Sequence, residues 1–85
     1  MNATAALPVV GIDLAKNVFQ LAVCDGAWRV FEELRLTRTQ MERWFVNRAV
    51  GLVVMEACGS AHHWARWLNS LGIEVRMLPA LYVRA

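Results

Sequence analysis

The sequence has few residues of the kinds that cross-link a small protein or anchor it in a membrane. Its two cysteines, Cys24 and Cys58, stand far apart without C-x-x-C or histidine spacing, which predicts reduced, buried thiols rather than a disulfide or zinc site. No uncharged apolar run approaches the roughly 18 residues of a membrane-spanning helix. Residues 1–8 also lack the basic start and cleavage pattern of a signal peptide. We therefore expect a cytoplasmic protein with no membrane partner.

Acidic residues are scarce as well, particularly toward the end of the chain. Nine Lys and Arg against seven Asp and Glu give a net charge of +2, which permits a polyanionic partner without requiring one. After Glu56 the only acid is Glu74.

Apolar residues, in contrast, are abundant. They make up 58% of the 85 residues, including four tryptophans, whereas a domain of this size buries only about 60% of its unfolded surface. This is more apolar surface than a thin layer of helices on a short sheet covers. We expect that a partner chain, or a further part of this one, is missing.

Three strand patterns occupy the first part of the sequence. Val9–Leu14 is a nearly continuous apolar run, typical of a central strand buried on both faces. Val18–Cys24 alternates, with Gln20 on its polar face, and Asp25-Gly26 is a hairpin signal. Trp28–Leu36 carries more charges, which suits an edge strand. These patterns predict a three-strand meander.

A helix and a second apolar strand are expected next. Thr37 and Gln40 form a capping-box pattern, and Met41, Trp44, Phe45 and Ala49 follow at helical spacing. Gly51 should end this helix. The run Leu52–Met55 then predicts a strand buried on both faces, and it ends in Glu56.

The last predicted elements are a helix and a strand. Gly59-Ser60 opens a helix whose apolar stripe includes Trp64 and whose end is Gly72. Residues 73–77 alternate as a strand that Pro79 stops. The order is β-β-β-α-β-α-β, and right-handed crossovers should place the fourth strand parallel to the first. This is an α/β, ribonuclease-H-like order within one domain, residues 1–85.

Two acids end the two apolar strands, and they are the candidate site. Adjacent parallel strands bring their carboxyl ends together at the edge where α/β folds bind ligands, so Asp13 and Glu56 should be neighbours. Carboxylates this close repel unless they share a cation, and their oxygens suit Mg²⁺ or Mn²⁺. Such a metal could activate a nucleophile on a phosphodiester. The alternative is that each acid only ends a strand and caps a turn.

These residues resemble a known family. Val10-Gly11-Ile12-Asp13-Leu14-Ala15-Lys16, and later Met55-Glu56-Ala57-Cys58-Gly59-Ser60, are similar to motifs of the N-terminal DEDD (RuvC-like) catalytic domain of bacterial insertion-sequence transposases. The resemblance implies that Asp13 and Glu56 are the first two of four acids that hold Mg²⁺ and that cut and rejoin DNA. It also implies a structured guide RNA and a homo-oligomer.

The sequence departs from this family in one respect. The last two acids of the pattern, a pair of aspartates on a later helix, have no counterpart before Ala85. The family's separate C-terminal domain, with its nucleophilic serine, is also absent. We therefore expect a truncated, incomplete domain that is inactive in DNA cleavage by itself.

Two other classes of function stay open. A Gly-Ile-Asp-Leu meander also begins actin-like and sugar-kinase ATPase half-domains, although Ala15-Lys16-Asn17 lacks the glycine and hydroxyl residue that bind phosphate there. The chain could also be a non-catalytic folded remnant or a dimerisation module.

Several other residues have weaker claims to function. Lys16 stands at the mouth of the predicted site and could contact a DNA phosphate. His62 and His63 share one helical turn without a third ligand and are interpreted as structural. Ser60 is interpreted as a helix N-cap, not a nucleophile. Trp67 lies off the apolar stripe and should pack against a missing segment or a partner subunit.

Overall fold

The protein is described by a computed structural model, which covers residues 7–15 and 17–79. Its elements follow the predicted order, and they are β1 (Val9–Leu14), β2 (Phe19–Cys24), β3 (Val30–Leu36), α1 (Arg38–Val46), β4 (Leu52–Glu56), α2 (Ala61–Ser70) and β5 (Glu74–Leu78). No helix among these residues has the length and apolar content to cross a bilayer.

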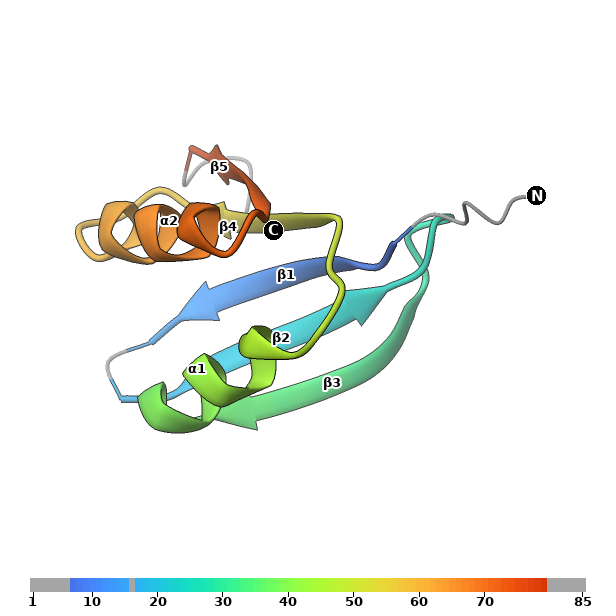
Figure 1. Ribbon diagram of the computed structural model, residues 1–85, viewed down its shortest axis with the longest axis horizontal. Helices are drawn as coiled ribbons and strands as arrows, with labels where there is room; N and C mark the ends of the chain where they lie inside the picture. Colours follow the sequence, from blue (N-terminus) through green and yellow to red (C-terminus); the bar gives the residue numbers. More distant parts are fainter. Residues whose placement is uncertain (1–6, 16, 80–85) are drawn as a thin grey trace.

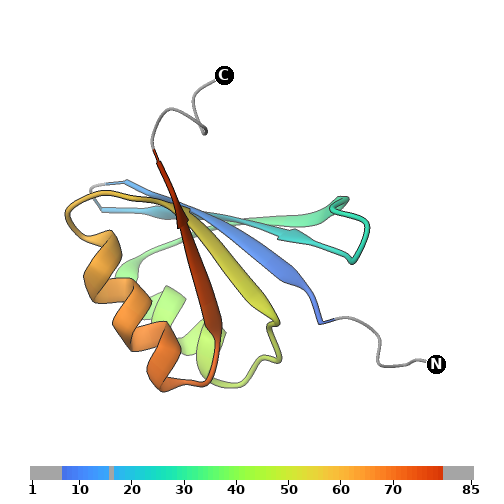
Figure 2. The same cartoon turned by 90° about the horizontal axis from the view of Figure 1, so that it is seen from above.

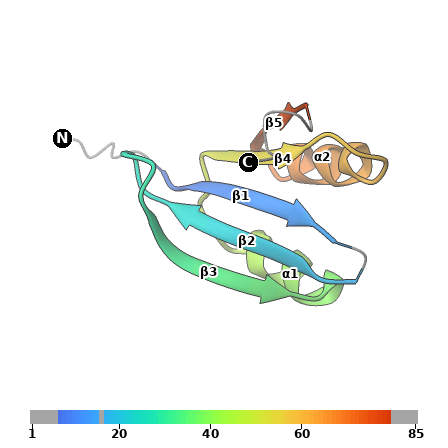
Figure 3. The ribbon, with the colours of Figure 1, turned by 180° about the vertical axis from the view of Figure 1, so that it is seen from behind.

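The strands form one mixed sheet in the order β3-β2-β1-β4-β5 (Figures 1 and 3). β1 pairs with β2, and β2 with β3, in antiparallel fashion. β1 pairs with β4, and β4 with β5, in parallel fashion. The prediction that the fourth strand lies beside the first and parallel to it is confirmed, and the fold is ribonuclease-H-like.

Both helices lie on the same side of the sheet (Figure 2). We call this side the covered face and the opposite side the open face. Because strand side chains alternate between faces, every second residue of β1, β2 and β4 enters the core beneath the helices. These covered-face residues are Val10, Ile12, Phe19, Leu21, Val23, Val53 and Met55, and the helices add Met41, Phe45, Ala61, Trp64 and Leu68.

The first turn of α1 has the capping box that the sequence predicts. The Thr37 hydroxyl accepts a hydrogen bond from the Gln40 amide at 3.3 Å, and the Gln40 side chain accepts one from the Thr37 amide at 2.9 Å. The far end of α1 differs from the prediction, because the helix ends at Val46 with Asn47 as its C-cap. Ala49 is therefore exposed, and Val50 enters the core instead.

The hairpin between β2 and β3 is wider than a two-residue turn. The Asp25 carboxylate accepts hydrogen bonds from the amides of Ala27 and Arg29, at 2.9 and 3.0 Å. Trp28 takes a left-handed conformation with φ of 64°, which is uncommon for a bulky residue. As a result β3 begins at Val30 and not at Trp28.

The expected excess of apolar surface is present at this hairpin. Trp28 and Phe31 are 62% and 61% exposed, and Val30 is 50% exposed.

The α2 helix corrects the prediction for Trp67. Its side chain is half-buried against the core, and its ring packs edge-to-face on Phe45 at 6.3 Å and on Trp64 at 5.6 Å. The sequence stripe of α2 did not predict this contact because α1 supplies part of it. Trp67 therefore belongs to the packing between the two helices.

The prediction of two buried thiols is right for Cys24 and wrong for Cys58. Cys24 ends β2 and is buried, whereas Cys58 is exposed. Cys58 lies in the loop between β4 and α2. The backbone has left the sheet there and has not yet entered the helix that packs on the covered face, so the Cys58 side chain does not enter the core.

Candidate functional site

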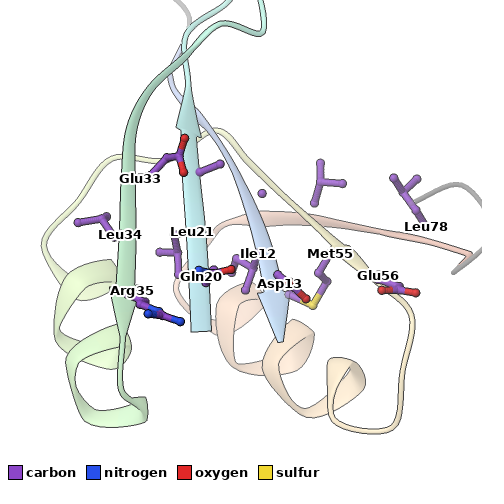
Figure 4. A pocket seen from close by; sticks show the side chains of 13 residues that line it. Ile12, Asp13, Gln20, Leu21, Glu33, Leu34, Arg35, Met55, Glu56 and Leu78 are labelled. Atoms are coloured by element: carbon purple, nitrogen blue, oxygen red, sulfur yellow. The ribbon is translucent and has the colours of Figure 1, made fainter. Parts of the chain in front are cut away.

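The open face of the sheet carries the second set of alternating side chains. Most of them are exposed or half-buried, because no helix among the described residues covers this side. They line a shallow groove of about 870 Å³ that crosses β3, β2, β1 and β4 (Figure 4). The open-face residues that line this groove are Gly11, Asp13, Gln20, Ala22, Glu33, Arg35, Val54, Glu56 and Leu78.

Asp13 and Glu56 both lie in this groove, on neighbouring strands. The parallel pairing of β1 and β4 matches Ile12 with Met55, so the next residue of each strand is one of the two acids. Neighbouring strands lie about 4.8 Å apart, and both acids point to the open face (Figure 4). The sequence prediction that the fold makes them neighbours therefore agrees with the strand register.

The local structure explains why both acids remain accessible. Each comes at the carboxyl end of its strand, where the chain turns away: Asp13 is exposed and Glu56 is half-buried. Within residues 7–15 and 17–79, neither carboxylate forms an ion pair. Both are thus free to take an external cation or hydrogen-bond donor.

The pair does not make a complete metal site by itself. In the part of the chain that the structure describes, no group of three or more His, Cys, Asp and Glu side chains could hold a metal ion. His62 and His63 are exposed on α2 and do not line the groove. Mg²⁺ usually binds through one or two carboxylates and keeps its other positions for water or phosphate. Two carboxylates with open space beside them therefore fit part of a ligand set for Mg²⁺ or Mn²⁺.

The remaining predicted residues do not join the pair. Ser60 occupies the N-cap position of α2 as predicted, but its side chain makes no capping bond there and lies 3.8 Å from the Cys58 sulfur. Lys16 lies outside the described residues.

Two groove residues were not identified as candidates from the sequence. Gln20 pairs with Asp13 across β1 and β2, and Arg35 pairs with Gln20 across β2 and β3. The alternation in β2 did indicate that Gln20 faces away from the core, but the register of β3 depends on the length of the hairpin loop. If the length of the loop between β2 and β3 were known, counting residues along β3 from that loop would identify Arg35 as the partner of Gln20.

No family model matches the chain. Several curated proteins are similar to it, and they are described as transposases. The chain is 44% identical over 75 residues to a protein of Pseudomonas aeruginosa described as a probable family 20 transposase, a match that covers 88% of this chain and 22% of that protein. It is 37% identical over 78 residues to the transposase for insertion sequence element IS1111A of Coxiella burnetii, covering 92% and 21%. It is 30% identical over 76 residues to the transposase for insertion sequence element IS1328 of Yersinia enterocolitica, covering 89% and 23%.

These matches cover most of this chain and a small part of each relative. The chain spans about one fifth of the length of the transposases that it matches. The similarity therefore shows that this chain resembles a part of several transposases, and it shows neither the metal nor the reaction of the whole protein.

Proposed function

We propose that this chain is the N-terminal part of a transposase catalytic domain of the DEDD, RuvC-like type. In the whole protein, Asp13 and Glu56 would supply two of the ligands for a Mg²⁺ or Mn²⁺ ion at the DNA phosphodiester that is cut and rejoined. The observation that supports this most directly is the position of the two acids. They share the open face at the carboxyl ends of adjacent parallel strands, in a chain that matches transposases over most of its length.

The chemistry of the pair follows from charge. Two carboxylates with no cationic partner among the described residues repel each other, and a divalent ion between them would relieve that repulsion. When bound, such an ion supplies Lewis acidity toward a phosphoryl oxygen and lowers the pKa of a bound water. The two carboxylates would hold that ion, and the covered-face core fixes the two strand ends that carry them.

Further acids are needed to complete this site, and we place them in the rest of the protein. The described residues contain no group of three or more His, Cys, Asp and Glu side chains that could hold a metal ion, and the inactivity of the 85 residues alone stays a prediction. A guide RNA and a homo-oligomer rest on the sequence resemblance alone and stay predictions. No observation favours the ATPase alternative.

The first test is binding of Mn²⁺ to the 85-residue chain, followed by paramagnetic broadening of its amide signals. We expect broadening centred on residues 12–14 and 55–57, and its loss in the Asp13→Asn and Glu56→Gln variants. Glu42→Gln, an acid on α1 away from the groove, is the matched control and should leave the broadening unchanged. Broadening that is absent from the two strand ends would contradict the proposed site.

The second test uses the full-length protein and its DNA strand transfer. Asp13→Asn should reduce DNA cleavage below detection, while Glu42→Gln should retain it. Cleavage that survives Asp13→Asn would show that this acid is not a metal ligand.

A further inference from the structure

One row of polar side chains crosses the open face at the level of the two acids. Asp13 is the register partner of Gln20, and Gln20 is the register partner of Arg35. Glu56 follows on the other side of Asp13, because Ile12 pairs with Met55. Arg35, Gln20, Asp13 and Glu56 thus stand on four adjacent strands, in that order, and all line the groove.

Arg35 differs from the arginines whose side chains are held by neighbours. Arg76 donates two hydrogen bonds of 3.1 Å to Glu74, Arg48 lies over the Trp44 ring at 4.3 Å, and Arg38 lies over the Trp64 ring at 5.4 Å. Within residues 7–15 and 17–79, Arg35 has neither an ion pair nor a ring beneath it. Its side chain is exposed and extends from β3 toward β2 and Gln20 (Figure 4).

We propose that Arg35, assisted by Gln20, binds a backbone phosphate of a DNA strand that lies across the open face. The inference rests on the proposed function, because it places this phosphate on the same DNA strand whose phosphodiester lies at Asp13 and Glu56. Two strand spacings separate Arg35 from Asp13, about 10 Å, which corresponds to a few nucleotides at about 3.4 Å per residue of one DNA strand. A guanidinium can bind a phosphate through two parallel hydrogen bonds, and the Gln20 amide adds a neutral donor.

The floor of the groove also suits a closely approaching backbone. Gly11 lies on the open face two residues before Asp13, and a Cβ added there would meet no atom within 4 Å. Packing among the described residues therefore does not explain this glycine. A glycine inside a strand often marks a place where a ligand or another backbone comes close.

The competing explanation for Arg35 is protection of the sheet edge, since charged residues on an edge strand discourage pairing with other chains. The two roles respond differently to a change of sign. Arg35→Glu keeps a charge on β3 and so keeps the edge protected, but it replaces a phosphate ligand with a group that repels phosphate.

The experiment measures the affinity of the 85-residue chain for a short DNA duplex over a series of salt concentrations. Arg35→Gln should weaken binding roughly tenfold. It should also make the negative slope of log affinity against log salt shallower by about 0.9, the value of one phosphate contact. Arg35→Glu should weaken it further. Arg29→Gln and Arg29→Glu are matched controls, because Arg29 is exposed at the hairpin and does not line the groove.

Equal effects at Arg35 and Arg29, or no DNA binding by the unmodified chain, would overturn the inference. Edge protection alone would appear as self-association of Arg35→Gln, with DNA affinity equal to that of Arg29→Gln. The Mn²⁺ broadening described above separates this failure from failure of the metal site. If broadening at Asp13 and Glu56 persists in Arg35→Gln while the salt slope does not change, only the Arg35 contact is wrong. If the slope becomes shallower in Arg35→Gln but the unmodified chain shows no localised broadening, the phosphate contact stands and the metal site is wrong.

Discussion

The two faces of the sheet are built from alternate residues of the same strands, yet they differ in what their side chains do. On the covered face, Met55 is 1% exposed and packs beneath the helices. Its neighbour Glu56 is half-buried on the open face with no ion pair among the described residues. Packing on one side therefore holds the strand ends in register, while the other side presents polar groups for binding. Stability and binding should respond separately to substitutions on the two faces.

The largest expected effect is the loss of a covered-face side chain. Met55→Ala removes a fully buried side chain and should lower the free energy of unfolding by about 2–5 kcal/mol, which is a large part of the total for a domain of this size. Glu56→Gln, one residue along, should change it by less than about 0.5 kcal/mol. Urea unfolding followed by tryptophan fluorescence compares the two. A similar cost at both positions would contradict the division between the faces.

The two helices that cover the sheet should respond differently to loss of their N-cap side chains. Thr37→Ala removes the capping box of α1 and should cost about 1 kcal/mol. Ser60→Ala at α2 should cost less than about 0.5 kcal/mol, because the Ser60 hydroxyl makes no capping bond. Thermal unfolding checks both, with about 4–8 °C expected per kcal/mol for a chain of this length. Equal shifts would mean that the Ser60 hydroxyl caps α2 in solution.

The hairpin offers a stabilising change far from the acids. Trp28→Gly should stabilise the protein by about 1 kcal/mol relative to Trp28→Ala, because the left-handed conformation at this position is costly for any residue with a Cβ. The alanine variant controls for loss of the exposed ring. The difference in midpoint of urea unfolding gives the value, and a difference near zero would place Trp28 outside the left-handed region in solution.

A smaller stabilising change is expected on the open face itself. Gly11→Ala should stabilise the strand by about 0.5–1 kcal/mol, since alanine loses less backbone freedom than glycine on folding and the added methyl group meets no neighbour. The same substitution should weaken DNA binding if a backbone approaches Gly11 closely. Calorimetric unfolding and the duplex titration measure the two effects. A loss of stability would show that the groove floor is more crowded than the structure indicates.

Much of the fold could be predicted because its signals are local. The apolar runs Val9–Leu14 and Leu52–Met55 define two central strands, and the Thr37 and Gln40 pair defines the start of a helix. The expected burial of these two strands on both faces is wrong for the described residues, because both helices cover the same face of the sheet. The predictions that differed involve contacts between elements or the geometry of a loop. Trp67 packs on a residue from the other helix, and Trp28 takes its conformation from the hydrogen bonds of Asp25.

The same distinction between local signals and contacts between elements applies to the candidate site. The sequence by itself determined that Asp13 and Glu56 end two central strands, because an apolar run is a pattern of neighbouring residues. Only the tertiary structure decided that Gln20 and Arg35 continue the same row. That alignment depends on the pairing register of three strands, and the register is set by a hairpin loop and by packing against the helices. A shift of one residue would have turned Arg35 to the covered face.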